Sequence, residues 1–321
     1  MKKILIDCDP GHDDMVALMV GLATDDAQVV GITTVAGNQT GDKTFLNARR
    51  VLTMIQRNDV PLAKGASKPL VRPLMTAEFI HGSSGLEGAE LPEPDGKILD
   101  ISARDLMVKI LKESDEKIIL VPTGPLTNIA TLITSAPDVL DKIERIVLIG
   151  GGIRDSNVTP GAEFNIIVDP EAARIVFQSG IPLTQVGLDV TNKTLLTYED
   201  IDMITQMKGK ISSYVGPLLK FFADMNKKNF GINGAPVHDA LAVATAIWPN
   251  IVKTEFLNVV IETQGEFTLG QTVTDVYKVT GRAPNVEVAI SVDVPKMRDI
   301  MISTIRKLDA LANKQLIKNG F

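Results

Sequence analysis

Short runs rich in valine and isoleucine alternate with longer segments of helical periodicity along the chain. A parallel sheet requires this order, because each strand is joined to its parallel neighbour by a crossover, usually a helix. Strands that are covered on both faces also read as continuous apolar runs. The alternation therefore predicts the α/β fold class, with a mostly parallel, Rossmann-like sheet that carries helices on both faces.

The periodicity also places the individual elements. The predicted strands are Lys3–Cys8, Gln28–Val35, Val60–Ala63, Lys117–Val121, Arg145–Ile149, Leu183–Val186, Phe256–Ile261 and Val286–Ser291. The predicted helices are Asp13–Leu22, Lys43–Gln56, Ala103–Glu113, Leu126–Ser135, Pro170–Gln178, Tyr198–Met207, Ser212–Lys228, Asp239–Trp248 and Met297–Lys314. Val71–Gly96 and Ile153–Glu163 are expected to be long loops, which are often functional in compact domains. No linker or repeat divides the chain, so residues 1–321 are predicted to form a single domain.

Charge and hydropathy exclude several classes of partner. The chain has 33 Lys and Arg against 39 Asp and Glu, a net charge of −6, and its basic residues are scattered. A protein that binds nucleic acid needs a basic patch, so neither nucleic acid nor an anionic membrane is an expected partner. The apolar stretch Met15–Ala23 is too short to span a bilayer, and the start of the chain lacks the apolar region of a signal peptide. We therefore expect a cytoplasmic protein, whose lone Cys8 is a buried strand residue without a disulfide partner.

Four acidic residues gather where the first predicted strand gives way to a helix: Asp7, Asp9, Asp13 and Asp14. This junction is the carboxyl end of a parallel strand, where ligands bind in open α/β sheets. Helix capping explains one or two acids at such a position, but not four within eight residues. Carboxylates at this density repel one another unless a divalent cation lies between them. The cluster predicts a site for a hard cation such as Ca²⁺ or Mg²⁺.

Two later segments add polar candidates. His238 and Asp239 stand at the start of a predicted apolar helix, where Asp239 suits either an N-cap or a site residue. His238, beside an acid, suits a general acid near neutral pH. Glu163 and Asn165 share one face if their segment is extended, and a carboxylate beside an amide suits the recognition of sugar hydroxyls. The spacing alone fits a solvated loop equally well. Asp169 and Pro170 read as the N-cap and first residue of the next helix.

Five segments, taken in order, carry a family resemblance. The opening Asp7-Cys8-Asp9-Pro10-Gly11-His12-Asp13-Asp14 resembles the D-x-D-P-G-x-D-D fingerprint of the inosine-uridine preferring nucleoside hydrolases. The other matching segments are Ile32-Thr33-Thr34-Val35-Ala36-Gly37-Asn38, Val121-Pro122-Thr123-Gly124-Pro125-Leu126-Thr127-Asn128, Ala162-Glu163-Phe164-Asn165 and Val237-His238-Asp239.

The resemblance implies the nucleoside hydrolase fold and a Ca²⁺-dependent hydrolase that cleaves the N-glycosidic bond of ribonucleosides to ribose and free base, in nucleoside salvage. It implies Asp9, Asp14 and Asp239 as calcium ligands, joined by the backbone carbonyl of Thr123. Asp9 is also the implied general base for the attacking water, His238 the candidate proton donor to the leaving base, and Asp7 a supporting residue. The implied substrate-binding residues are Asp13, Asn38, His81, Asn157, Glu163, Phe164, Asn165 and Phe230.

The base preference follows from two further segments, Phe230–Pro236 and Phe177–Pro182. Both are more similar to the pyrimidine-preferring ribonucleoside hydrolases, which implies uridine and cytidine as preferred substrates and slower hydrolysis of inosine. Asn226 and Phe230 have no phenolic hydroxyl, so proton donation by a tyrosine at these positions is not expected. The family also implies a homo-tetramer or homo-dimer.

Two alternative functions remain open from the residues alone. A strand that ends in Asp7-Cys8-Asp9 also opens haloacid-dehalogenase-like Mg²⁺ phosphatases, with Asp7 as nucleophile. Against this, Asp13 and Asp14 follow closely and Glu163 would repel a phosphoryl group. The other alternative is a nucleoside-binding module without catalysis, which would bind ribose compounds and release no free base.

Overall fold

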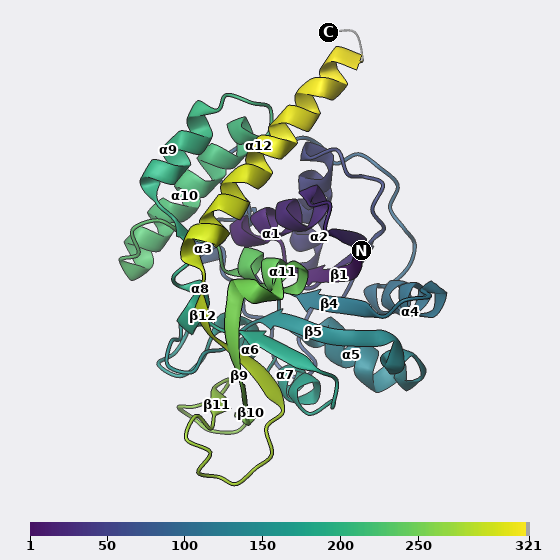
Figure 1. The fold of residues 1–321 in the computed structure, drawn as a ribbon, viewed down its shortest axis with the longest axis vertical. Helices are drawn as coiled ribbons and strands as arrows, with labels where there is room; N and C mark the ends of the chain where they lie inside the picture. Colours follow the sequence, from purple (N-terminus) through teal and green to yellow (C-terminus); the bar gives the residue numbers. More distant parts are fainter. Residues whose placement is uncertain (319–321) are drawn as a thin grey trace.

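One eight-stranded sheet organises the fold, in the order β3-β2-β1-β4-β5-β6-β12-β9 (Figure 1). All neighbouring strands are parallel except β12 and β9, so the predicted mostly parallel sheet is confirmed. The computed structural model describes residues 1–318, and residues 319–321 of the predicted domain lie outside it. The strands are β1 (Lys2–Cys8), β2 (Ala27–Thr34), β3 (Leu62–Lys64), β4 (Ile118–Pro122), β5 (Ile143–Ile149), β6 (Leu183–Val186), β9 (Val252–Leu257) and β12 (Val286–Val292).

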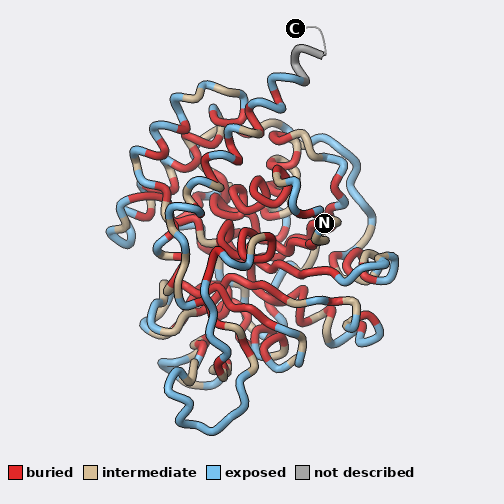
Figure 2. The backbone as a smooth tube through the Cα atoms, in the orientation of Figure 1, coloured by how far each residue is buried: buried red, intermediate tan, exposed pale blue. Residues whose placement is uncertain are grey.

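Helices cover both faces of this sheet, and each face has its own apolar core. One core joins the sheet to α1, α2, α10, α11 and α12, and the other joins it to α4, α5 and α7. Figure 2 shows the buried residues concentrated in the sheet and in the helices that pack on it. The bounds are α1 (His12–Ala23), α2 (Gly41–Met54), α4 (Ala103–Glu113), α5 (Thr127–Ser135), α7 (Pro170–Phe177), α9 (Tyr198–Gln206), α10 (Ser212–Phe230), α11 (His238–Ile247) and α12 (Val294–Lys318).

The central strand β1 shows why a continuous apolar run is needed here. Successive side chains of a strand point to opposite faces, so Ile4 and Ile6 enter one core and Leu5 enters the other. All three are 0% exposed. Because β1 lies between β2 and β4, its carboxyl end opens near the middle of the sheet edge. The acidic segment that follows β1 is therefore placed where open α/β sheets bind their ligands.

One strand prediction is wrong in its bounds. Instead of a single strand over Phe256–Ile261, the edge strand β9 starts at Val252, and a separate strand β10 (Val259–Ile261) pairs with β11 (Thr272–Thr274). Asn258 divides the two, and its side chain donates a hydrogen bond to the carbonyl of Ala283 at 2.8 Å. The middle of β9 faces solvent, as edge strands do, so its first half lacks the apolar run that marks a buried strand.

Several short elements have no clear signal in the sequence. A helical turn, α3 (Glu78–His81), interrupts the predicted loop Val71–Gly96, whereas Ile153–Glu163 contains no helix or strand in the described structure. Asp169 caps α7 by accepting a hydrogen bond from the amide of Ala172, as predicted. The other short elements are η1 (Pro137–Lys142), α6 (Phe164–Val168), α8 (Leu188–Thr191), β7 (Leu195–Leu196), β8 (Ala235–Pro236) and η2 (Pro249–Ile251).

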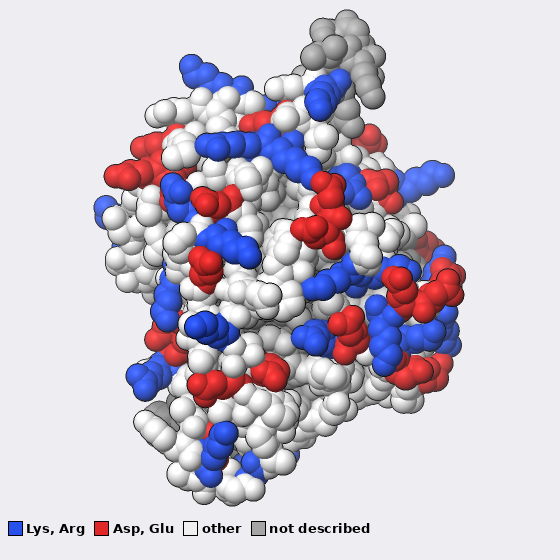
Figure 3. All heavy atoms as spheres, viewed as in Figure 1, with Lys and Arg blue, Asp and Glu red and all other residues white. Residues whose placement is uncertain are grey.

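The surface carries charges of both signs. On the face drawn in Figure 3, Lys and Arg side chains are interspersed with Asp and Glu side chains. Among the described helices, none combines the length and the apolar character that crossing a bilayer requires.

Candidate active site

A cavity of about 590 Å³ opens beside the carboxyl ends of the central strands. The predicted site residues converge on it from distant parts of the chain. Those that line the cavity are Asp13, Asn38, His81, Thr123, Asn157, Glu163, Phe164, Asn165, Phe230, His238 and Asp239. Three other predicted residues, Asp7, Asp9 and Asp14, are 1% exposed or less and lie behind this lining.

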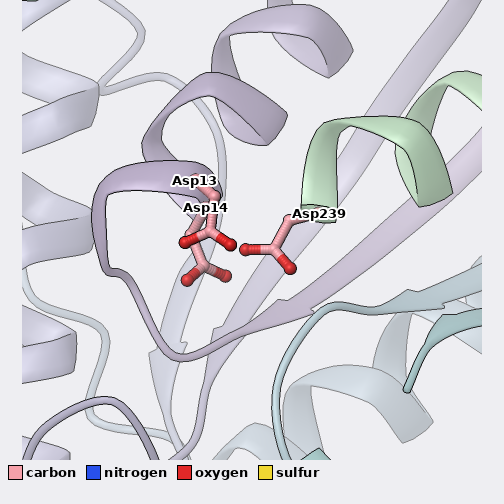
Figure 4. A group of neighbouring side chains, drawn as sticks. All are labelled: Asp13, Asp14 and Asp239. Carbon is pink, nitrogen blue, oxygen red and sulfur yellow. The ribbon is translucent and has the colours of Figure 1, made fainter. Parts of the chain in front are cut away.

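The acidic cluster forms where α1 meets α11. Figure 4 shows Asp13 and Asp14 on the first turn of α1 with their carboxylates turned toward Asp239 on α11. One carboxylate oxygen from each of the three lies within 4.8 Å of the others. Asp239 is the second residue of α11 and the N-cap position belongs to Val237, so the N-cap reading of Asp239 is wrong. Its carboxylate is directed to the cluster instead of back to its own helix.

Asp14 is held in place from three directions. Its Oδ2 accepts hydrogen bonds from the backbone amide of Gly11 at 3.0 Å and from Asn38 Nδ2 at 3.2 Å. Its Oδ1 accepts a hydrogen bond from Thr123 Oγ1 at 2.8 Å. The segments after β1, β2 and β4 therefore converge on one carboxylate.

Asp9 and Asp7 form the layer beneath. The backbone amide of Asn38 donates to Asp9 Oδ2 at 2.7 Å, whereas Asp9 Oδ1 has no hydrogen-bond partner among the described residues. Asp7 Oδ1 accepts from Thr33 Oγ1 at 2.6 Å and from Asn128 Nδ2 at 2.8 Å. Asp7 therefore anchors the strand ends to each other, and it is not among the residues that line the cavity.

Burial raises the pKa of every carboxyl in the cluster. Burial is the largest cause of the rise to about 7 for Asp7 and to about 8 for Asp13, and neighbouring carboxylates add to it. The pKa values of Asp9 and Asp239 also lie well above the ordinary range for the same two reasons. One buried carboxylate oxygen on each of Asp7, Asp9 and Asp13 has no hydrogen-bond partner among the residues that the structure describes, so these residues alone do not satisfy the cluster. An all-oxygen donor set of this kind fits a hard divalent cation.

The side of the cavity lined by Glu163 and Asn165 differs from the expectation drawn from the sequence. The segment is helical, not extended: Glu163 is the N-cap of α6, and Asn165 lies within that helix. The extended reading fails because Glu163 Oε2 caps the helix, accepting from the amides of Gly151 at 2.9 Å and Ile166 at 3.3 Å. Both side chains nevertheless line the cavity. Burial raises the pKa of Glu163 to about 7.

Hydrogen bonds fix the neighbours of Glu163 as well. Asn165 Nδ2 donates to the carbonyl of Thr123 at 2.9 Å, which ties α6 to the end of β4. Asn157 Oδ1 accepts from the amide of Phe164 at 2.9 Å, so the Asn157 amide nitrogen remains available to a ligand. This side of the cavity therefore presents carboxylate and amide groups to a polyhydroxylated ligand.

The opposite side of the cavity is aromatic and contains two histidines. His238 Nδ1 lies 2.8 Å from Thr191 Oγ1, and burial lowers the pKa of His238 to about 4. Phe230 packs edge-to-face against Phe79, with ring centroids 6.3 Å apart. Phe79 and Thr191 have no signal in the sequence that marks them as site residues. Phe222 also lines the cavity, and its spacing from Asn226 and Phe230, which places all three on one face of α10, is a signal that could have predicted it.

Comparison with known proteins identifies the family. Residues 4–299 match the family model described as inosine-uridine preferring nucleoside hydrolase. The chain is 46% identical over 309 residues to the pyrimidine-specific ribonucleoside hydrolase RihA of Shewanella baltica, covering 96% of this chain and 97% of that protein. It is 47% identical over 304 residues to RihA of Salmonella schwarzengrund, covering 94% and 98%.

Solved structures agree with this assignment. The purine-preferring ribonucleoside hydrolase from Gardnerella vaginalis superposes with a TM-score of 0.91 at 33% identity, covering 97% of this chain and 100% of that one. The plant nucleoside hydrolase PpNRh1 superposes with a TM-score of 0.89 at 29% identity, covering 95% and 98%. This chain belongs to the inosine-uridine preferring nucleoside hydrolase family.

Proposed function

We propose that this protein hydrolyses the N-glycosidic bond of ribonucleosides with the help of a bound Ca²⁺ ion, and that it prefers pyrimidine nucleosides. The observation that carries the proposal is the convergence of the Asp13, Asp14 and Asp239 carboxylates beside a cavity that also has a polar side and an aromatic side. The polar side suits ribose, and the aromatic side suits a base.

The proposed calcium ligands are Asp9, Asp14 and Asp239, with the carbonyl of Thr123. That carbonyl accepts one hydrogen bond from Asn165 and has a second lone pair for a cation. Asp13, which is also part of the compact group, is assigned to the ribose because it lines the cavity, whereas Asp9 lies beneath. When bound, the cation lowers the pKa of a water molecule and orients the ribose hydroxyls.

Two residues of the chain carry out the two proton transfers, Asp9 from the attacking water and His238 to the leaving base. Asp9 Oδ1, which has no hydrogen-bond partner in the described part of the chain, is the proposed acceptor of the proton from the attacking water. The bond from the anomeric carbon to the base breaks as the bond to the water oxygen forms, and the base leaves with the bonding electrons. The buried carboxylates stabilise the positive charge that develops on the ribosyl group.

His238 is the proposed proton donor to the leaving base. Its lowered pKa keeps it neutral near pH 7. Negative charge that develops on the departing base favours the protonated imidazole, because an opposite charge close by raises the pKa of a histidine. His238 therefore takes up a proton from solvent as the base departs and passes that proton to the base.

The remaining proposed contacts concern the sugar. Asp13, Asn38 and Asn165 face the ribose ring, while Asn157 and Glu163 hold the 5′-hydroxyl. An ionised Glu163 accepts a hydrogen bond from a hydroxyl and repels a phosphate. The arrangement therefore favours nucleosides over nucleotides.

The preference for pyrimidines rests on the relatives. The relatives named pyrimidine-specific are 45–47% identical to this chain, whereas the Gardnerella protein named purine-preferring is 33% identical. Phe230, His81 and Phe164 line the cavity and are the proposed contacts near the base and ribose. We further propose that the protein acts in nucleoside salvage in the cytoplasm and is a homo-tetramer or homo-dimer. Cell fractionation tests the location, and sedimentation tests the oligomeric state.

The experiment measures free ribose from uridine, cytidine, inosine and adenosine, with phosphate release from nucleoside monophosphates as a control. We expect uridine and cytidine to be cleaved faster than inosine. Equal or faster cleavage of inosine would overturn the pyrimidine preference. Binding of nucleosides without release of ribose would indicate a binding module, and phosphate release would indicate the phosphatase, which the family match and the buried position of Asp7 do not favour.

A further inference from the structure

The loop Ile153–Glu163 forms one wall of the cavity, because residues 156–160 all line it. This loop carries Asn157, which the proposed function assigns to the 5′-hydroxyl of the ribose. Within the described chain, no helix or strand falls inside the loop. Contacts with other elements must therefore hold Asn157 in place.

The start of this loop is bound by Asp189, a residue of the short helix α8. Asp189 Oδ2 accepts a hydrogen bond from the backbone amide of Ile153 at 2.5 Å, and Oδ1 accepts one from the amide of Arg154 at 3.0 Å. Hydrogen bonds to an ionised carboxylate are stronger than those between neutral groups. One carboxylate thus clamps two consecutive backbone amides and fixes the direction in which the chain enters the loop.

Three consecutive glycines let the chain approach Asp189 this closely. Gly151 has a φ of +65°, in the left-handed region that favours glycine. A Cβ on Gly152 would lie 2.2 Å from the carbonyl oxygen of Asp155 and 3.0 Å from Asp189 Oδ2. The run Gly150-Gly151-Gly152, which does not have the spacing of a dinucleotide-binding motif, is therefore required for a tight turn beside the Asp189 carboxylate.

Two further hydrogen bonds join the region of α8 to the same turn. The backbone amide of Leu188 donates to the carbonyl of Gly151 at 2.9 Å. Asn192, which follows α8 and lines the cavity, donates from Nδ2 to Asp155 Oδ2 at 2.9 Å. The chain is thus held on both sides of the two clamped amides.

The opposite end of the loop closes on Ala162. Its carbonyl oxygen accepts from the amide of Val158 at 3.1 Å and from that of Asn157 at 3.3 Å. The side chain of Asn157 is held as well, because its Oδ1 accepts from the amide of Phe164. Asn157 therefore lies between this closed end and the end that Asp189 clamps.

A local role in its own helix does not explain Asp189. The N-cap of α8 is Gly187, and both amides that Asp189 accepts from belong to the loop. Asp189 is also not among the residues that line the cavity. Any effect of Asp189 on a ligand must therefore act through the loop.

We propose that Asp189 is a positioning residue, which clamps the amides of Ile153 and Arg154 so that Asn157 is already in place to bind the 5′-hydroxyl of the nucleoside. A preformed contact avoids the entropy that a ligand must otherwise spend on ordering a loop. The inference rests on the proposed function for the role of Asn157, whereas the clamp is a property of the protein alone. Asp189 thereby contributes to the selectivity for substrates that have a 5′-hydroxyl.

The first test measures hydrogen exchange at single backbone amides by NMR. We expect the amides of Ile153 and Arg154 to be protected in the wild type and to exchange about tenfold faster in Asp189→Ala, as the loss of one hydrogen bond requires. Asp189→Asn keeps the shape of the side chain and one acceptor oxygen, so it should retain protection at one of the two amides. Unprotected Ile153 and Arg154 amides in the wild type would overturn the proposal whether or not the protein hydrolyses nucleosides.

The second test compares uridine with 5′-deoxyuridine, which differs only in its missing 5′-hydroxyl. In Asp189→Ala the preference for uridine, measured as the ratio of the two kcat/KM values, should fall about tenfold. The kcat/KM for 5′-deoxyuridine itself should stay unchanged, because this substrate has no 5′-hydroxyl to lose. An equal loss for both substrates would mean that Asp189 only supports the fold of the site, and the proposal would be wrong.

A double substitution tests whether Asp189 acts through Asn157. Asn157→Ala should by itself reduce the preference for uridine over 5′-deoxyuridine. Adding Asp189→Ala to Asn157→Ala should reduce this preference no further, because two residues that act on one contact are not additive. Additive effects of the two substitutions would exclude the route through Asn157.

Asp275→Ala is the matched control for both tests. Asp275 accepts hydrogen bonds from the amides of Val279 and Thr280, which are also consecutive, and none of these residues lines the cavity. We expect this variant to keep the wild-type preference for uridine and the wild-type protection of Ile153 and Arg154.

Failure of the proposed function has a different result. If the wild type releases no ribose from any nucleoside, the proposed function is refuted, and the preference is then measured by calorimetry as the ratio of the dissociation constants of 5′-deoxyuridine and uridine. A fall of about tenfold in that ratio in Asp189→Ala would support the clamp. An unchanged ratio would overturn it.

Discussion

Substitution of Gly37 by alanine probes the placement of Asp9 without altering any charged group. Gly37 follows β2, and an ideal Cβ built there lies 2.1 Å from Asp9 Oδ2, whereas ordinary contact begins at 3.4 Å. The same Cβ would lie 2.7 Å from Cδ of Pro125, so the new methyl group has little room to retreat. The Asp9 carboxylate must therefore move by about 1.3 Å.

A displacement of this size is large for a catalytic group, because a misplacement of about 1 Å costs on the order of 100-fold in rate. We expect Gly37→Ala to lower kcat/KM for uridine by about that factor. The assay is ribose release, with circular dichroism and thermal melting to show that the variant is folded.

Gly41→Ala is the matched control, because its Cβ would meet nothing closer than the Cα of Ser67 at 3.3 Å. It lies four residues away, at the first position of α2. We expect it to retain wild-type activity. A folded Gly37→Ala enzyme with the activity of Gly41→Ala would refute the claim that Asp9 acts from its observed position.

Four further outcomes are expected. Because burial raises the pKa of Glu163 to about 7, Glu163 becomes anionic as the pH rises through that value. The selectivity for uridine over uridine 5′-monophosphate, measured as the ratio of their kcat/KM values, should therefore increase from about pH 6 to about pH 8. The same ratio should change less with pH in Glu163→Gln. Phe230→Ala removes the edge-to-face contact with Phe79 and should raise KM for uridine about fivefold. Phe267→Ala is its control and should leave KM unchanged, because the Phe267 side chain is 81% exposed and does not line the cavity. Asp309 accepts hydrogen bonds from the amides of Ile211 and Ser212 at the start of α10, so Asp309→Ala should lower the free energy of unfolding in a denaturant titration by about 1–2 kcal/mol and leave kcat unchanged. A calcium titration measured by calorimetry should show that Asp9→Asn binds Ca²⁺ more weakly than Asp13→Asn does. The reverse order would exchange the roles proposed for these two carboxylates.

The part of the site that follows β1 could be predicted because it is local in sequence. The continuous apolar run Ile4, Leu5 and Ile6, which is buried on both faces of the sheet, predicts the strand, and the dense acids after it mark a ligand-binding end. Which of the four acids Asp7, Asp9, Asp13 and Asp14 lines the cavity, and which lie behind it, could not be predicted in the same way. It depends on Asn38 and Thr123, which arrive from the ends of β2 and β4 and hold Asp9 and Asp14 behind Asp13.

Long-range contacts account for most of what the sequence left open. Asp239 joins the acidic cluster because α11 packs against α1. The sequence of neither helix indicates this contact. The start of α11 one residue earlier than predicted turns Asp239 from a cap into a cluster member. Glu163 shows the same effect, since a short helix that propensity does not reveal changes the direction of its carboxylate.

The most direct test of the account is ribose release from uridine by protein stripped of divalent cations with a chelator and then supplied with Ca²⁺ or Mg²⁺. We expect the stripped protein to be inactive, because the buried carboxylates near Asp9 lack the cation that the donor set fits, and we expect Ca²⁺ to restore activity better than Mg²⁺. Full activity in the stripped protein, with metal analysis confirming that no cation remains, would contradict a cation-dependent hydrolysis.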